Sequence, residues 1–212
     1  MNFRFSLIVL AVVALTTGAF GQAIPGAPAD AFMVRYASNL AVGDSIINLT
    51  NAGTQNTAGG ALTNLCANVY TFSPDEQLVS CCACSVTPNA LQALSVNSDL
   101  ISNTLTPAHP TSVVIKIMWT AGVACNASVV PTAAQLASGG VAWGTTLHAL
   151  PVTAGTPAGT YALTETRFAE RGLSTAELAR NTSFCGFIQS NGSGFGICRS
   201  CRLGGLGGVK QQ

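Results

Sequence analysis

The residues best suited to chemistry are the cysteines, and two groups of them are closely spaced. Cys81-Cys82-x-Cys84 and Cys198-x-x-Cys201 each bring thiols within a few residues of one another. Closely spaced thiolates can hold one tetrahedral zinc ion, and a Cys-x-x-Cys pair can lower a thiol pKa for redox exchange. An even number of cysteines in an exported chain instead favours structural disulfides. The eight cysteines are Cys66, Cys81, Cys82, Cys84, Cys125, Cys185, Cys198 and Cys201.

We predict that all eight cysteines form disulfides, with no metal ion and no cofactor. A redox Cys-x-x-Cys usually begins a helix, whereas Cys198 and Cys201 follow a Gly-rich turn. If residues 77–84 form a strand, Cys81 points to the opposite face from Cys82 and Cys84, so one sheet could be cross-linked on both faces. The sequence leaves the pairing open.

Histidines and carboxylates offer little convergent chemistry. His109 lies between Pro107 and Pro110, and His148 ends a predicted strand. Glu165 and Glu170 could suggest a glycosidase pair, but Glu165 shares a strand face with Arg167, so a cross-strand or surface ion pair explains them more simply. We predict no catalytic, cofactor-binding or metal-binding residue.

The N-terminus has the layout of a secretory signal peptide. A short basic start with Arg4 precedes an uncharged apolar run, and small residues lie three and one positions before a cleavage point after Gly21. We therefore predict a signal peptide over residues 1–21 and a secreted protein that is extracellular, on the cell surface or periplasmic. No second stretch is long enough to span a membrane.

The remaining chain predicts one mainly β domain over residues 31–202, between a loose leader (22–30) and a flexible Gly-rich tail (203–212). Several short segments alternate in polarity, which favours a β-sandwich-like fold. In the clearest of them, 113–119, Val113, Ile115, Ile117 and Trp119 share one face. The predicted strands are 32–37, 45–50, 65–72, 77–84, 113–119, 141–147 and 161–168.

The sequence also predicts a hairpin, the buried face of one strand and the order of elements in residues 87–103. Residues 73–76 (SPDE) predict a turn that joins the arms 65–72 and 77–84 into a hairpin, with Cys66 near Cys82 and Cys84. Val141, Trp143 and Leu147 share a face that we expect to point into the core. Residues 87–103 predict a short turn of helix followed by a strand.

One late helix is well marked. Ser174 and Glu177 form a capping box, with Leu173 and Leu178 as a hydrophobic staple. Leu178, Cys185 and Ile188 then share one face, and residues 191–192 (NG) end the helix. The Gly-rich turn that follows could bring Cys198 or Cys201 back to Cys185.

The charge content limits the partners. Charged residues make up 8% of the chain, against about 25% in typical soluble domains. Loss of Arg4 with the signal peptide leaves equal numbers of basic and acidic residues. A surface with so few charges favours self-association and lacks the basic patch that nucleic acid requires.

The motif Cys81-Cys82-Ala-Cys84 followed by Thr87-Pro88-Asn89, together with residues 67–77 (ANVYTFSPDEQ), 94–97 (LSVN) and 99–103 (DLISN), resembles a group of uncharacterised exported acidobacterial proteins. The resemblance covers residues 64–201. It implies export and a shared cysteine framework, and it carries no activity.

We rank three functions. The first is an exported, non-enzymatic structural or surface protein that self-associates as a homo-oligomer. The second is an extracellular module that binds a carbohydrate or surface polymer. Trp119, Trp143 and Tyr161 could stack on sugar rings, and solvent exposure of either tryptophan would favour this function. The third is a secreted enzyme of unknown reaction, which a pocket gathering Glu165, Asp99 or a histidine would favour. A sandwich fold can host all three.

Overall fold

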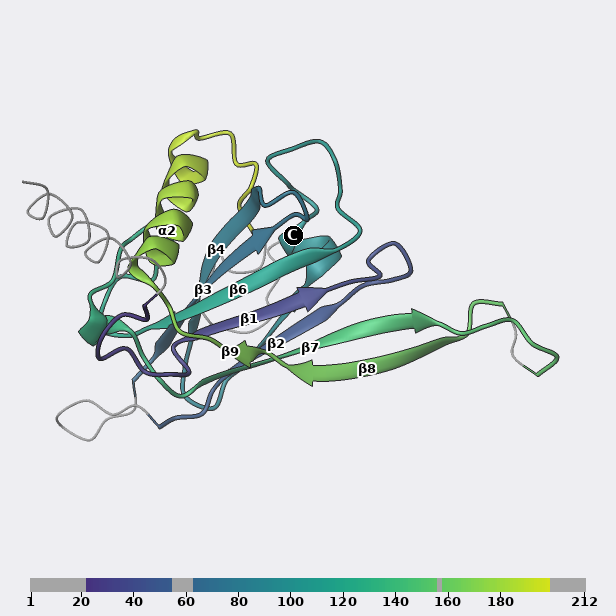
Figure 1. Cartoon of the computed structure of the whole chain (residues 1–212), viewed down its shortest axis with the longest axis horizontal. Helices are drawn as coiled ribbons and strands as arrows, with labels where there is room; N and C mark the ends of the chain where they lie inside the picture. The colour runs from purple at the N-terminus through teal and green to yellow at the C-terminus, as the bar shows by residue number, and fades with distance from the viewer. Residues whose placement is uncertain (1–21, 55–62, 156–157, 199–212) are drawn as a thin grey trace, which may run out of the picture.

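The computed structural model describes residues 22–54, 63–155 and 158–198. It confirms a mainly β fold with two antiparallel sheets and one late helix (Figure 1). The predicted signal peptide (1–21), the tail (203–212) and Cys201 lie outside the described residues. In the part of the chain that the structure describes, no helix is long and apolar enough to cross a bilayer.

The larger sheet has five strands in the order β4-β3-β6-β1-β9. The hairpin predicted around residues 73–76 is confirmed, because the Ser73 N–H donates to the Gln77 carbonyl and the Glu76 N–H donates to the Ser73 carbonyl. The strands are β1 (Phe32–Ala37), β3 (Leu65–Phe72), β4 (Leu78–Val86), β6 (Val113–Thr120) and β9 (Ala169–Glu170).

The smaller sheet has four strands in the order β5-β2-β7-β8. Its long ribbon of β7 and β8 extends beyond the rest of the sandwich (Figure 1). The strands are β2 (Ile46–Asn51), β5 (Leu91–Ser95), β7 (Gly140–Ala149) and β8 (Tyr161–Arg167).

The core lies between the two sheets. The face of β6 predicted to be buried is confirmed, since Val113, Ile115, Ile117 and Trp119 are all fully buried. Residues Ile47 and Leu49 of β2 meet them from the smaller sheet. Alternating apolar residues on both sheets therefore form one continuous core, as in other sandwiches.

Residues 87–103 fold in the reverse order to the prediction. The strand β5 comes first, and a short π-helix, η1 (Val96–Leu100), follows it. The Ser95 hydroxyl accepts a hydrogen bond from the Ser98 N–H, and Asp99 accepts one from the Ser95 N–H at 2.7 Å. The helix-capping residue, Ser95, lies at the end of β5, so the helical turn can form only after the strand. A second short helix, the 3₁₀-helix η2 (Ala133–Gln135), follows β6.

The helix α2 (Thr175–Ser190) packs on the side of the five-stranded sheet that points away from the four-stranded sheet (Figure 1). Ser174 caps it as predicted, accepting from the Glu177 N–H at 3.1 Å. The Glu177 carboxylate does not complete the capping box, because it accepts from Lys116 Nζ on β6 at 2.5 Å. The expected buried face is confirmed, since Leu178, Cys185 and Ile188 are buried against the sheet in a second apolar cluster.

The leader is held in place rather than loose. The Ile24 N–H donates to the Leu173 carbonyl at 2.8 Å, and Asp30 Oδ2 accepts from the Gly139 N–H at 2.8 Å. Ile24 also packs against the apolar cluster under α2. Its Pro- and Ala-rich composition suggested flexibility, but these two hydrogen bonds and the packing of Ile24 join it to the domain.

Candidate functional site

The four-stranded sheet presents one open face to solvent, which we call the outer face. Its register brings every second residue of the four strands to that side. Leu91 is 62% exposed, Leu163 61% and Tyr161 48%, so the face is not covered. Its residues are Ile46, Asn48, Thr50, Leu91, Ala93, Ser95, Val141, Trp143, Thr145, Leu147, Ala149, Tyr161, Leu163, Glu165 and Arg167.

The expectation that Val141, Trp143 and Leu147 face the core is wrong. They lie on the outer face and are partly exposed, while Ala142, Gly144 and Thr146 point inward. The reason is that large side chains of the opposite sheet, Arg35 and Trp119, already fill the space between the sheets at this position.

Two glycines of β7 make room for those large side chains. A Cβ on Gly144 would overlap the Arg35 side chain, and one on Gly140 would overlap the indole of Trp119. Close packing leaves no volume there for a second large residue. The apolar side chains of β7 are therefore displaced to the outside.

Trp143 lies at the centre of the outer face among polar side chains. Asn48 of β2 is its partner on one side and Arg167 of β8 on the other. Asn48 Nδ2 donates to Glu165 Oε1 at 3.3 Å, and Thr145 follows two residues along β7. Arg167 forms its ion pair with Glu170, at 3.0 Å, rather than with Glu165, the partner that the shared strand face suggested. An indole surrounded by amide, hydroxyl, carboxylate and guanidinium groups can bind a ligand that is both apolar and hydroxylated.

Trp119, unlike Trp143, is not accessible to solvent. It is fully buried in the core between the sheets, and its indole nitrogen has no hydrogen-bond partner among the described residues. Of the two tryptophans, only Trp143 can therefore meet a ligand from solvent.

Arg35 lies beneath the outer face and ties β8 to the larger sheet. Its guanidinium donates to Thr146 Oγ1 at 2.8 Å and to the Thr166 carbonyl at 3.1 Å. Burial lowers the pKa of Arg35, and the charge of Glu165 partly opposes this effect. The sequence predicts no role for Arg35, because a charged residue within an alternating strand is usually on the exposed face.

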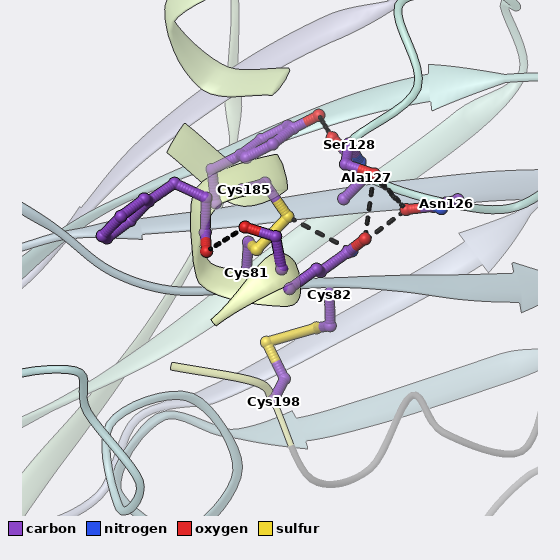
Figure 2. Close-up of a disulfide and its surroundings, with 11 residues drawn as sticks. Cys81, Cys82, Asn126, Ala127, Ser128, Cys185 and Cys198 are labelled. Carbon is purple, nitrogen blue, oxygen red and sulfur yellow. Dashed lines mark hydrogen bonds between the residues drawn. A yellow bond between two sulfur atoms is a disulfide. The ribbon is translucent and has the colours of Figure 1, made fainter. Parts of the chain in front are cut away.

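The described cysteines form disulfides. Figure 2 shows Cys81 bonded to Cys185 of α2 and Cys82 bonded to Cys198, on opposite faces of β4. The cross-linking of both faces is thus confirmed. Because Cys185 bonds Cys81, the suggested return of Cys198 or Cys201 to Cys185 is wrong.

The remaining cysteines extend this framework. Cys66 bonds Cys125. In the hairpin it lies opposite Ser85, one position from Cys84, but Cys84 points to the other face of the sheet. Cys84 is also disulfide-bonded. The seven described cysteines are therefore not available as zinc-binding thiolates.

The histidines lie apart from the outer face's centre. His148 Nε2 is 2.9 Å from Thr164 Oγ1, on the side of β7 opposite Trp143. His109 lines a cavity of about 300 Å³ with Ser102, Thr104 and Phe195, and its Nδ1 lies 2.9 Å from the Ile101 carbonyl oxygen. Neither Glu165 nor Asp99 lines this cavity. Of the residues that could have favoured an enzyme, the cavity therefore contains one histidine and neither carboxylate.

Comparison with models of known protein families, with curated proteins and with solved structures finds no match for this chain.

Proposed function

We propose that this protein is an exported binding module for a neutral polysaccharide, with the outer face of the four-stranded sheet as its binding surface. The observation that supports this most is the position of Trp143, partly exposed at the centre of that face. This was the feature expected to distinguish a binding module from a purely structural protein.

The chemistry around Trp143 suits a sugar ring. A pyranose has an apolar side of C–H groups, which stacks on an aromatic ring, and a rim of hydroxyls that donate and accept hydrogen bonds. Asn48, Glu165 and Arg167 offer both donors and acceptors beside the indole. The face carries one carboxylate and one guanidinium, so it has no excess of charge to select a polyanion.

The shape of the face suits an extended chain rather than a single sugar. Tyr161 lies opposite Ala149, six residues along β7 from Trp143, which corresponds to about 20 Å at the rise of a strand. Leu147 and Leu163 lie opposite each other between the two aromatic residues. A linear polymer of several sugar units could therefore lie along β7 and β8.

The test is binding to a panel of neutral polysaccharides, such as cellulose, β-1,3-glucan, mannan and xylan, by pull-down and calorimetry. Trp143→Ala should weaken binding by about tenfold or more, because truncation of a central aromatic anchor removes most of the contact energy. Phe187→Ala is the matched control, since Phe187 is 64% exposed on α2, away from the outer face. It should bind like the parent protein.

Two outcomes would overturn the proposal. One is the absence of binding to every polysaccharide in the panel by the folded, oxidised protein. The other is equal loss of affinity in both variants, which would show that exposed aromatic residues bind non-specifically. Self-association, ranked first from the sequence, remains a proposal that a different part of the molecule supports.

A further inference from the structure

The edge of the four-stranded sheet at β8 carries backbone N–H and C=O groups that have no hydrogen-bond partner among the described residues. The Phe168 N–H donates to the Ala142 carbonyl at 2.9 Å, and the Leu150 N–H donates to the Thr160 carbonyl at 3.1 Å. Because hydrogen-bonding direction alternates along an antiparallel strand, the even-numbered residues of β8 point their N–H and C=O groups toward β7. Those of Tyr161, Leu163, Glu165 and Arg167 point away from it.

This edge has little of the usual protection among the described residues. β8 is the last strand of its sheet, and six of its seven residues are exposed. It contains no proline, no lysine and no bulge, which are among the devices that normally prevent strands from pairing between molecules. Its two charged side chains, Glu165 and Arg167, have opposite signs and so do not repel a second copy as a run of like charges would. The ribbon also extends away from the sandwich, where another chain can reach it (Figure 1).

We propose that β8 pairs antiparallel with β8 of a second copy, about a two-fold axis at Thr164. This register uses the whole strand and places Thr164 opposite Thr164 of the second copy. It also places Arg167 opposite Tyr161 of the second copy, where a guanidinium can lie over an aromatic ring. A two-fold axis at Glu165 would instead oppose two carboxylates, which is unfavourable.

Two further properties fit a pair of identical chains. The strand β8 holds one acidic and one basic side chain, and the whole chain has a formal charge of +1. Electrostatic repulsion between two copies is therefore small. The pairing uses the same patch on both copies and therefore closes at two. Because one seven-residue edge is short, the dimer should be weak and dissociate on dilution.

The first test is a cysteine cross-link in the oxidised protein. Opposed residues that do not share backbone hydrogen bonds have Cα atoms about 4.5 Å apart, within disulfide range. Thr164→Cys should therefore give a covalent dimer under mild oxidation. Ala162→Cys is the matched control, because two copies of residue 162 would be offset by four positions, or about 13 Å. It should stay monomeric on a non-reducing gel.

The second test removes one outward N–H from the edge. Leu163→Pro should abolish the concentration-dependent dimer seen by light scattering, and the β7 ladder should survive because that N–H does not point to β7. Its melting temperature reports whether the variant is folded. If that variant misfolds, Thr164→Lys tests the same edge, because it places two lysines directly opposite each other at the two-fold axis, which should also abolish the dimer.

The proposal is overturned by a parent protein that stays monomeric at all concentrations, by filaments instead of dimers, or by equal cross-linking at residues 162 and 164. It does not rest on polysaccharide binding. Trp143→Ala, which should lose the polysaccharide, should dimerise like the parent, so failure of one proposal leaves the other intact.

Discussion

At the scale of single residues, a buried tyrosine joins the larger sheet to a disulfide-bonded loop. Tyr70 of β3 is fully buried, and its hydroxyl donates to the Ala127 carbonyl at 2.7 Å. Gln189 of α2 holds the same loop by donating to Asn126 Oδ1 at 3.0 Å. The loop that contains Cys125 is therefore fixed by the sheet and by the helix as well as by its disulfide.

Tyr70 should make the protein less stable at alkaline pH. Burial raises the pKa of Tyr70 above its ordinary value of 10.0, because the phenolate would lose its hydration. The unfolded chain then ionises first, so this contribution to the free energy of unfolding is complete below pH 10 and falls as the pH rises further.

Urea unfolding at pH 8 and at pH 10.5 checks this prediction. Tyr70→Phe should cost about 1 kcal/mol at pH 8 through the lost hydrogen bond, and it should lose less stability than the parent between the two pH values. An equal decline in both proteins would show that another group controls the alkaline limb.

At the scale of elements, the sandwich depends on how large and small residues alternate between the sheets. Arg35 of β1 fills the space over Gly144 of β7, and the guanidinium then reaches β8. This single side chain therefore links three strands, and Gly144 is the position that permits it.

Gly144→Ala should lower the free energy of unfolding by about 1–3 kcal/mol, because the new methyl group overlaps Arg35 in a closely packed interior. Gly186→Ala is the matched control. Its Cβ would meet Ser128 Cβ at an ordinary 3.7 Å, and alanine is the better helix former by about 1 kcal/mol. Chemical denaturation should therefore give opposite signs, and equal effects would contradict the packing argument.

The elements also show how far the sequence could predict the structure. The strand β6 and the helix α2 were predictable, because their apolar periods and the Ser174 cap are local signals. The direction of Trp143 was not, because it depends on Arg35 and Trp119 in the facing sheet. A pattern within one strand says which residues share a face, but not which face the opposite sheet can accommodate.

The same limit applies to the binding surface and to the disulfides. Asn48 and Glu165 lie far apart in sequence, and only the register of β2, β7 and β8 brings them beside Trp143. The opposite directions of Cys81 and Cys82 followed from strand geometry, but their partners depend on where α2 and the last described residues pack.

At the scale of the whole molecule, the disulfides join the early hairpin to late parts of the chain. Cys81–Cys185 spans 104 residues and Cys82–Cys198 spans 116, whereas Cys66–Cys125 spans 59. Long loops of this kind restrict the unfolded chain strongly. They also fix α2 and the segment after it to the two faces of β4.

Replacing Cys81 and Cys185 together by alanine should lower the free energy of unfolding by about 2–5 kcal/mol, and it should make α2 more sensitive to proteases. The pair Cys66→Ala and Cys125→Ala is the control. It should cost less, because its loop is shorter and Cys125 is exposed. Denaturant unfolding and limited proteolysis followed by mass spectrometry check both effects, and cleavage of α2 at equal rates in the two variants would contradict the assignment.

The positions of these disulfides constrain the order in which the protein matures during synthesis. The thiols of Cys81 and Cys82 emerge from the ribosome long before Cys185 and Cys198, and their nearest early neighbours are each other, Cys66 and Cys84. An oxidant that acts at once would join the wrong sulfurs, and a thiolate would have to reopen those bonds. Correct maturation should therefore need either delayed oxidation or a disulfide isomerase in the compartment where the chain folds.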